Sequence, residues 1–126
     1  MHRFIPIALL ALFSIAFFAS PAEEAAGTLR HVVAFKFKAD ADQRQIDKVV
    51  EEFRGLKNSI DTIVSFETGT NNSPENLNKG FTHCFILTFK NEKDRDAYLV
   101  HPAHKAFGKL VGPVVDDVFV IDFWAD

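Results

Sequence analysis

The chain has 126 residues, a formal net charge of −3 and a single cysteine. This length suits one domain with one hydrophobic core, and a mildly acidic chain with mixed charges argues against nucleic acid as a partner. A single thiol forms no internal disulfide, so Cys84 is either a buried strand residue, which we favour, or a bridge between two chains.

Residues 1–22 have the pattern of a secretory signal peptide. Arg3 precedes an almost unbroken apolar run from Phe4 to Ala19, and Ser20-Pro21-Ala22 supplies the small residues that a signal peptidase reads. The run approaches the length of a membrane span, so a retained anchor is the alternative, but the small-residue site favours cleavage. We therefore expect an exported protein, periplasmic or secreted, without membrane association after cleavage, and a short linker over residues 23–28.

Residues 29–38 predict a strand, because apolar residues alternate with polar or smaller ones. One face of this strand is apolar apart from a histidine, and it comprises Leu29, His31, Val33, Phe35 and Phe37. A helix then begins after Asp40 or Asp42 and runs to about Lys57. Its apolar stripe recurs at helical spacing and comprises Ile46, Val49, Val50, Phe53 and Leu56.

Three further strands and two short helices follow. Residues 63–70 and 81–90 alternate as strands, and in the second of them His83 lies near the start of an aromatic and aliphatic row, as His31 does in the first strand. We expect the two histidines to be neighbours on one sheet face. Asn91 or Asp94 caps a helix to about Val100, Pro102 starts another that ends at Gly112-Pro113, and residues 114–124 form the last strand.

This order of elements predicts an α+β fold, the ferredoxin-like split βαβ arrangement with a four-stranded antiparallel sheet and helices on one face. The other face is then too apolar for solvent, and we assign to it Val32, Ala34, Val64, Phe66, Cys84, Ile86, Val118, Val120 and Trp124. A homodimer would bury two such faces against each other and form a shared dimeric α+β barrel.

The candidate site centres on the segment from Tyr98 to Phe107, which holds two histidines and the only tyrosine of the chain. His31 and His104 are candidate catalytic residues, one taking a proton beside a carbonyl and the other, or the Tyr98 hydroxyl, holding the developing enolate. We expect an apolar pocket around them, lined by Val33, Phe35, Phe53, His83 and Phe107. The alternatives are a noncatalytic ligand site and a purely structural cluster in which the two histidines bond each other or the backbone.

The sequence gives no reason to expect a metal or a cofactor. His101 and His104 have the spacing of side chains that share a helix face, but no His-Glu-x-x-His pattern accompanies them. His101 precedes Pro102 and occupies a capping position. Glycine-rich phosphate loops, a nucleophile elbow and Cys-x-x-Cys are absent from the sequence.

Four segments together resemble the stress-responsive A/B barrel (Dabb) family of dimeric α+β barrels. They are Leu29–Lys38, Phe66–Asn71, Gly80-Phe81-Thr82-His83, and Tyr98-x-x-His101-Pro102-x-His104-x-x-Phe107. The resemblance spans Leu29 to Trp124, so we assign the Dabb domain to residues 29–126. It implies a dimeric barrel and a stress-related role.

One plant branch of that family cyclises linear polyketides, and its two histidines correspond by position to His31 and His104, with Tyr98 lining the pocket. A tyrosine that shapes the pocket of that branch is replaced here by Phe53. The expected function is therefore an exported Dabb protein that binds or processes a small hydrophobic molecule without a cofactor. The alternatives are a lyase or cyclase, a structural dimeric module, and a dimeric-barrel monooxygenase.

Overall fold

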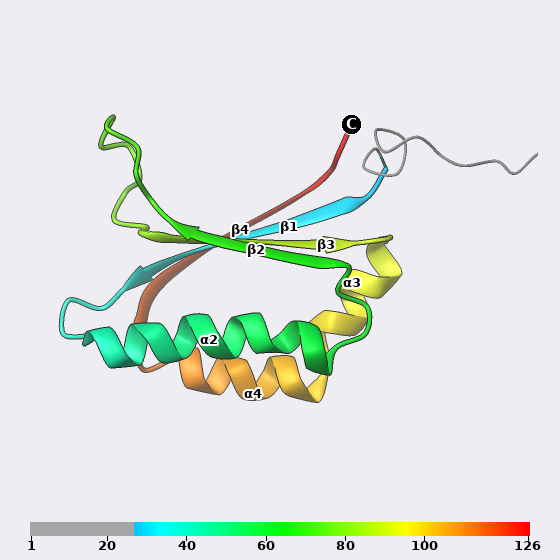
Figure 1. Ribbon diagram of the computed structural model, residues 1–126, viewed down its shortest axis with the longest axis horizontal. Helices are drawn as coiled ribbons and strands as arrows, with labels where there is room; N and C mark the ends of the chain where they lie inside the picture. Colours follow the sequence, from blue (N-terminus) through cyan, green and yellow to red (C-terminus); the bar gives the residue numbers. More distant parts are fainter. Residues whose placement is uncertain (1–26) are drawn as a thin grey trace, which may run out of the picture.

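The computed structural model describes residues 27–126, so the predicted signal peptide and residues 23–26 of the predicted linker lie outside the described part. A four-stranded sheet lies above two long helices, and a short third helix lies at one end (Figure 1). The elements are β1 (Leu29–Phe37), α2 (Gln43–Ser59), β2 (Ser65–Thr70), β3 (His83–Phe89), α3 (Glu92–Leu99), α4 (Pro102–Val111) and β4 (Val115–Trp124).

The sheet has the strand order β2-β3-β1-β4, and all of its neighbouring strands are antiparallel. Strands β1 and β3 occupy the centre and have the most buried side-chain rows, while β2 and β4 form the edges and are largely exposed. Val33 of β1 faces Phe85 of β3 on one side and Val120 of β4 on the other. The predicted ferredoxin-like fold is confirmed.

Each helix begins at a side chain that caps it. Asp42 starts α2 in a capping box with Gln45, in which each side chain bonds the backbone of the other residue. Asn91 starts α3 by accepting a hydrogen bond from the backbone of Asp94. His101 starts α4 through its Nδ1 atom, and Pro102 follows at the first helical position.

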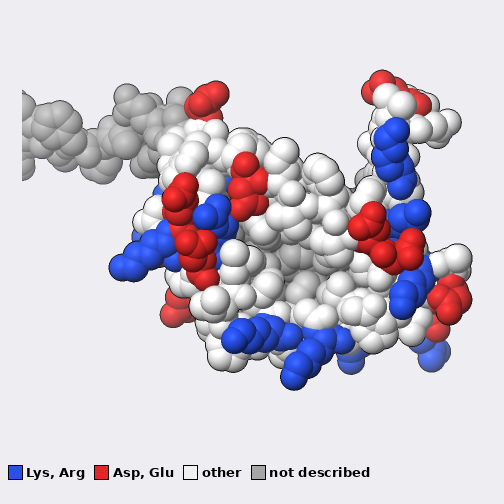
Figure 2. Space-filling model, turned by 180° about the vertical axis from the view of Figure 1, so that it is seen from behind, with Lys and Arg blue, Asp and Glu red and all other residues white. Residues whose placement is uncertain are grey.

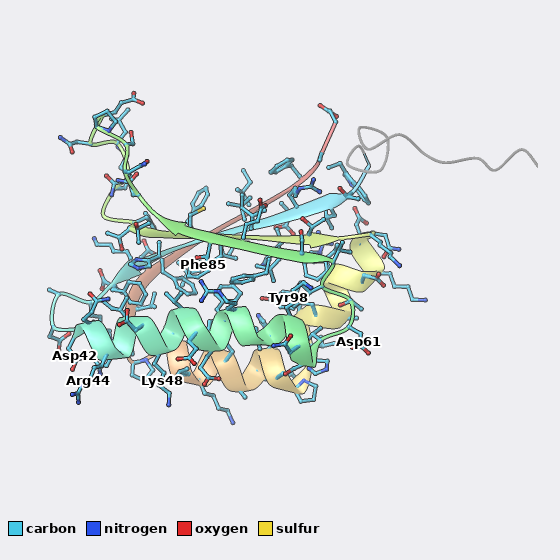
Figure 3. All side chains as sticks on the ribbon, in the orientation of Figure 1. Asp42, Arg44, Lys48, Asp61, Phe85 and Tyr98 are labelled. Carbon is cyan, nitrogen blue, oxygen red and sulfur yellow. The ribbon has the colours of Figure 1, made fainter. Side chains whose placement is uncertain are left out.

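The core lies between the sheet and the helices, where Phe85 and Tyr98 both point (Figure 3). Phe53 of α2 lies at its centre, with ring centroids 4.4 Å from Phe85 and 4.6 Å from Phe107. Phe35 of β1 joins the same cluster, 5.1 Å from Phe85. This aromatic packing holds α2 and α4 against β1 and β3.

The open face of the sheet differs from the predicted one in β2 and β4. Phe66 packs on the helix side, 5.3 Å from Phe53, and Val64 follows the same alternation. Val118 and Val120 also line a pocket on the helix side, and Trp124 is in register with the core residue Leu29. The open face instead carries Val32, Ala34, Cys84, Ile86, Phe119, Ile121 and Phe123.

The assignment of β4 was wrong because both of its residue rows are apolar, so alternation alone does not show which row is covered. The structure also places Cys84 on the open face, where it is exposed, which corrects the expectation of a buried thiol. Within residues 27–126, no helix is long and apolar enough to cross a membrane.

Candidate functional site

A pocket of about 420 Å³ lies on the helix side of the sheet, between β1, β4 and the helices. Its walls bring together seven of the predicted site residues: His31, Val33, Phe35, Phe53, Tyr98, His104 and Phe107. The pocket also includes three charged residues, Arg95, Asp96 and Asp122. Most of the remaining wall is apolar, so a bound molecule would lose contact with water over much of its surface.

The polar centre of the pocket is a pair between buried His31 of β1 and partly exposed Asp122 of β4. His31 is 5% exposed, and its Nδ1 atom lies 2.7 Å from Oδ1 of Asp122. A carboxylate only accepts, so the proton is on Nδ1, and in the neutral ring the lone pair is then on Nε2. Asp122 thus fixes both the orientation and the tautomer of His31.

Arg95 of α3 completes this polar centre from the other side. Its Nη1 atom donates to Oδ2 of Asp122 over 3.1 Å, and its Nε atom donates to Oδ1 of Asp96 over 3.1 Å. The hydrogen bond to Asp96 is the main cause that raises the pKa of Arg95. The guanidinium therefore stays charged and is shared between two carboxylates.

Tyr98 contacts both candidate histidines. Its ring centroid lies 5.7 Å from that of His31 and 4.5 Å from that of His104. Burial raises the pKa of Tyr98 far above its usual value of 10.0, and the Asp122 charge adds to this. The hydroxyl is thus protonated at neutral pH and is available as a donor.

His104 is held differently from His31. Burial lowers its pKa below 6.5, a hydrogen bond with the Leu99 backbone partly opposes this, and the nearby His31 lowers it further. A neutral imidazole on the pocket wall has a lone pair or a proton to offer, which is what a general base or a hydrogen-bonding ligand site requires.

The pocket opens towards the edge of the sheet. Val118 and Val120 of β4 line it and are 47% and 52% exposed, because no helix covers that edge. Seen from behind, where α4 and β4 lie in front, the molecule has an uncharged, hollowed centre with its charged side chains around the rim (Figure 2). The entrance is therefore largely apolar.

His83 is not part of this pocket, contrary to the prediction. It shares a sheet face with His31, but it is in register with Phe35, whereas His31 is in register with Leu87. Four residues of β3 therefore separate the two positions, on the order of 13 Å along an extended strand. His83 instead packs edge-on against Phe37, with centroids 5.0 Å apart, and its Nδ1 atom lies 2.9 Å from the Thr82 hydroxyl.

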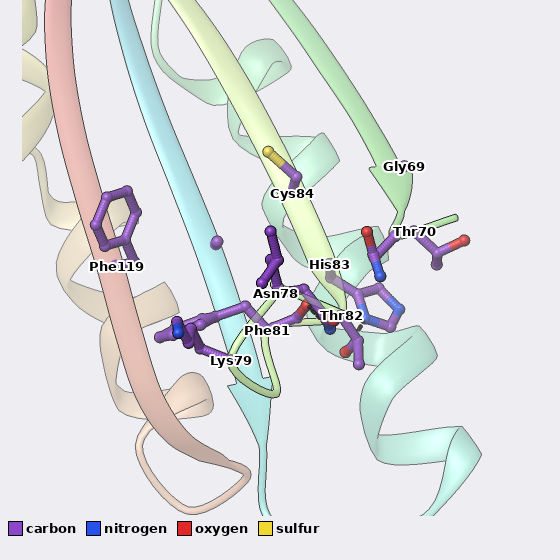
Figure 4. A pocket seen from close by; sticks show the side chains of 12 residues that line it. Gly69, Thr70, Asn78, Lys79, Phe81, Thr82, His83, Cys84 and Phe119 are labelled. Carbon is purple, nitrogen blue, oxygen red and sulfur yellow. Dashed lines mark hydrogen bonds between the residues drawn. The ribbon is translucent and has the colours of Figure 1, made fainter. Parts of the chain in front are cut away.

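A second hollow of about 490 Å³ lies on the open face, between the sheet and the loop that joins β2 to β3. Phe119 and Cys84 lie on the same side of the sheet there, with Phe81 and Lys79 at one end (Figure 4). Its wall is mostly apolar and contains none of the paired charges of the first pocket. We therefore regard it as part of the open face and not as a chemical site.

Metal-binding residues do not cluster in the part of the chain that the structure describes. Within residues 27–126 no group of three or more His, Cys, Asp or Glu side chains is placed to hold an ion. His101 uses Nδ1 to accept a hydrogen bond from the Ala103 backbone, 3.0 Å away, and thereby serves as a helix cap.

Among the pocket residues that the sequence reasoning missed, Asp122 and Arg95 matter most, because they form the polar centre with His31. Asp122 carries a detectable signal, since it is the only charged residue between Val118 and Trp124 in an otherwise apolar strand. No sequence signal marks Arg95 as a site residue, because α3 is rich in charged residues on all sides and its apolar pattern is weak. Only the hydrogen bond from Arg95 on α3 to Asp122 on β4 identifies it.

With this geometry established, comparison with known proteins assigns the family. A model described as the stress responsive A/B barrel domain, Dabb, matches residues 29–125. The chain belongs to the Dabb family. The stress-response A/B barrel domain-containing protein HS1 of Arabidopsis thaliana is 35% identical over 101 residues, which cover 80% of this chain and 93% of HS1. Olivetolic acid cyclase of Cannabis sativa is 24% identical over 95 residues, covering 75% of this chain and 94% of the cyclase.

Solved Dabb-like structures agree with the fold. The hydroxynitrile lyase of Passiflora edulis superposes with a TM-score of 0.75 at 25% identity, covering 80% of this chain and 95% of the lyase. A dimeric protein of ferredoxin-like fold from Bacteroides fragilis gives 0.63 at 25% identity, covering 78% of this chain and 96% of that one. The fold is therefore shared with a lyase and with a protein described as dimeric.

Proposed function

We propose that this Dabb protein is exported, has a stress-related role, and binds or processes a small hydrophobic molecule in the pocket around His31. The observation that carries the proposal is the His31–Asp122 pair, in which His31 is buried, on the wall of a mostly apolar pocket of about 420 Å³. Export rests on the signal pattern of residues 1–22, and the stress-related role rests on the family.

The pocket favours ligand binding over a purely structural cluster. His31 and Tyr98 are themselves almost fully buried, but together with His104 they line a space of ligand size, which a cluster that only fastened helix to sheet would not need. The structural alternative also required His31 and His104 to bond each other or the backbone. His31 bonds Asp122, and only His104 has a backbone partner, at Leu99.

A second candidate function is cofactor-independent acid–base chemistry in the same pocket. His31 has its tautomer fixed by Asp122, His104 has a lowered pKa, and Tyr98 keeps its proton. One imidazole would remove a proton next to a carbonyl, and the hydroxyl would donate to the oxygen on which charge develops. Relatives named as a cyclase and a lyase are consistent with this chemistry.

We also propose that two copies associate through the open face. Ile121 and Phe123 are 52% and 49% exposed in the single chain, and their neighbours on that face are apolar as well. An apolar sheet face of this kind is costly to leave in water, and an isologous dimer buries it twice. Dimeric relatives of the same fold support this arrangement.

The test uses the full chain and its His31→Ala and His104→Ala variants. A panel of small aromatic and aliphatic ketones, alcohols and cyanohydrins is screened by ¹H–¹⁵N NMR, and turnover is followed by product chromatography. Binding should shift the signals of the pocket residues and should weaken at least about tenfold in both variants.

Turnover that both variants abolish while remaining folded would favour the enzyme. Binding without turnover would favour a carrier. If no ligand shifts the NMR signals of the pocket residues in the unaltered protein, and the two variants change only its stability, both the enzyme and the carrier are contradicted. The structural module would then remain.

A further inference from the structure

The charged groups of the His31 pocket bear on the kind of molecule that it accepts. The pocket wall holds a single cation, Arg95, and two carboxylates, those of Asp96 and Asp122. Arg95 donates one hydrogen bond to each carboxylate. The wall therefore offers no cation without a carboxylate partner, and its fixed charges sum to a negative value.

From this arrangement we infer that the ligand of the pocket is an uncharged carbonyl or hydroxyl compound with an apolar body, and that carboxylates and other anions are rejected. This inference rests on the proposed function, since it names the chemical class of the molecule bound at that site.

The remaining polar groups of the pocket suit such a molecule. The Tyr98 hydroxyl keeps its proton and can donate to a carbonyl oxygen. The imidazole of His104, whose pKa is lowered, is mainly uncharged at neutral pH and can exchange a hydrogen bond with a hydroxyl. Neither group provides the full positive charge that a buried anion requires.

An anion would also lose its hydration on entering. The rest of the wall is made of side chains such as Val33, Phe35 and Phe107, which return no hydrogen bonds. A buried charge without a partner is strongly unfavourable, and a carboxylate beside Asp122 would add like-charge repulsion. A ketone or an alcohol loses less hydration and recovers much of it through one hydrogen bond.

Asp96 gives the clearest way to alter this selectivity. Its side chain is 64% exposed and bonds Arg95, whereas His31 bonds Asp122, so the change does not remove either partner of the His31–Asp122 pair. The change Asp96→Asn removes one negative charge and releases Arg95 from half of its pairing. Asp94, on the same helix but outside the pocket wall, provides the matched control Asp94→Asn.

The experiment compares acetophenone, benzyl alcohol and benzoate, which share a ring and differ in charge, by NMR titration of the full chain at pH 7.5. Acetophenone or benzyl alcohol should bind at least about tenfold more tightly than benzoate. Asp96→Asn should strengthen benzoate binding about threefold relative to acetophenone binding, while Asp94→Asn should not change the ratio of the two affinities.

Benzoate binding as tight as that of the neutral probes, at the same pocket residues, would overturn the inference and leave the proposed function standing. The absence of pocket shifts with every probe would overturn the proposed function, and this inference with it. An equal response of Asp94→Asn and Asp96→Asn would show that general charge, and not the pocket wall, sets the preference.

Discussion

The two faces of the sheet have opposite chemistry, and adjacent residues of β4 show it most directly. Asp122 points to the helix side and holds His31 and Arg95, whereas Ile121 points to the open side and is in register with Val32. The covered face thus pairs its polar groups with one another, whereas the open face exposes large apolar side chains such as Ile121 and Phe123 in the single chain. The two proposals follow this division, with ligand binding assigned to the covered face and association to the open face.

The first prediction tests the open face and has the largest expected effect. Ile121→Asp would place a carboxylate in the middle of the proposed dimer interface, where it would be buried without a partner. We expect the dimer dissociation constant to rise by at least about a hundredfold, measured by light scattering after size-exclusion chromatography.

The control is Val100→Asp, because Val100 is 65% exposed and follows α3, away from the open face. It should leave the dimer intact. If Ile121→Asp remains dimeric at the same concentration, the chain associates through another surface. The proposal that the open face is the dimer interface would then be wrong.

The second prediction tests the covered face. Asp122→Ala would leave the Nδ1 group of buried His31 without its acceptor and would free the Nη1 group of Arg95. We expect the free energy of unfolding to fall by about 2–3 kcal/mol, measured by urea denaturation at a fixed protein concentration.

Asp116→Ala on the same strand is the matched control. Within residues 27–126 its carboxylate pairs with Lys36, 3.7 Å away, and both side chains are largely exposed. This change should alter stability by no more than about 0.5 kcal/mol. If both variants lower the free energy of unfolding equally, the His31–Asp122 pair stabilises the fold no more than the exposed Lys36–Asp116 pair does.

The difference between the two faces could be predicted from the sequence only in part. The central strands were assigned correctly, because in β1 and β3 the helix-facing row is the richer in large apolar side chains. In β4 both rows are apolar, so Val118 and Val120 were placed on the open side, whereas Phe119 and Ile121 occupy it. An edge strand that is exposed on both sides lacks the contrast on which alternation depends.

The residues of the candidate site were likewise predicted only in part from the sequence. His31, Tyr98 and His104 meet in one pocket, as expected from the motifs that carry the resemblance to the family. His83 was placed beside them because periodicity reports the face of a sheet and not the position along it. That position depends on strand register, which only pairing of β1 with β3 determines.

The third prediction concerns pH and tests the covered face, because His83 and His104 both lie on that side of the sheet. Burial lowers the pKa of each below 6.5, with Asp47 opposing this at His83 and His31 adding to it at His104. Between the lowered values and 6.5 the unfolded chain binds more protons than the folded one. Stability is therefore complete above pH 6.5 and falls as the pH drops below it.

Urea denaturation between pH 5 and 8 measures this dependence. The double variant His83→Gln/His104→Gln should have a flatter profile below pH 6.5, and each single variant should lie between it and the unaltered chain. The same slope in all four proteins would show that other groups cause the acid sensitivity.

The last prediction has the smallest effect on stability and separates the chemistry of the covered face from its packing. Tyr98→Phe keeps the ring that contacts Phe89, His31 and His104, and removes only the hydroxyl. We expect the free energy of unfolding to change by less than about 1 kcal/mol, because the packed area is retained. Acetophenone binding, followed by NMR titration, should nevertheless weaken by about fivefold, since the donor to its carbonyl is lost. A loss of stability above about 2 kcal/mol with unchanged binding would assign the hydroxyl to the fold, and His104 would then be the remaining uncharged polar group for a ligand.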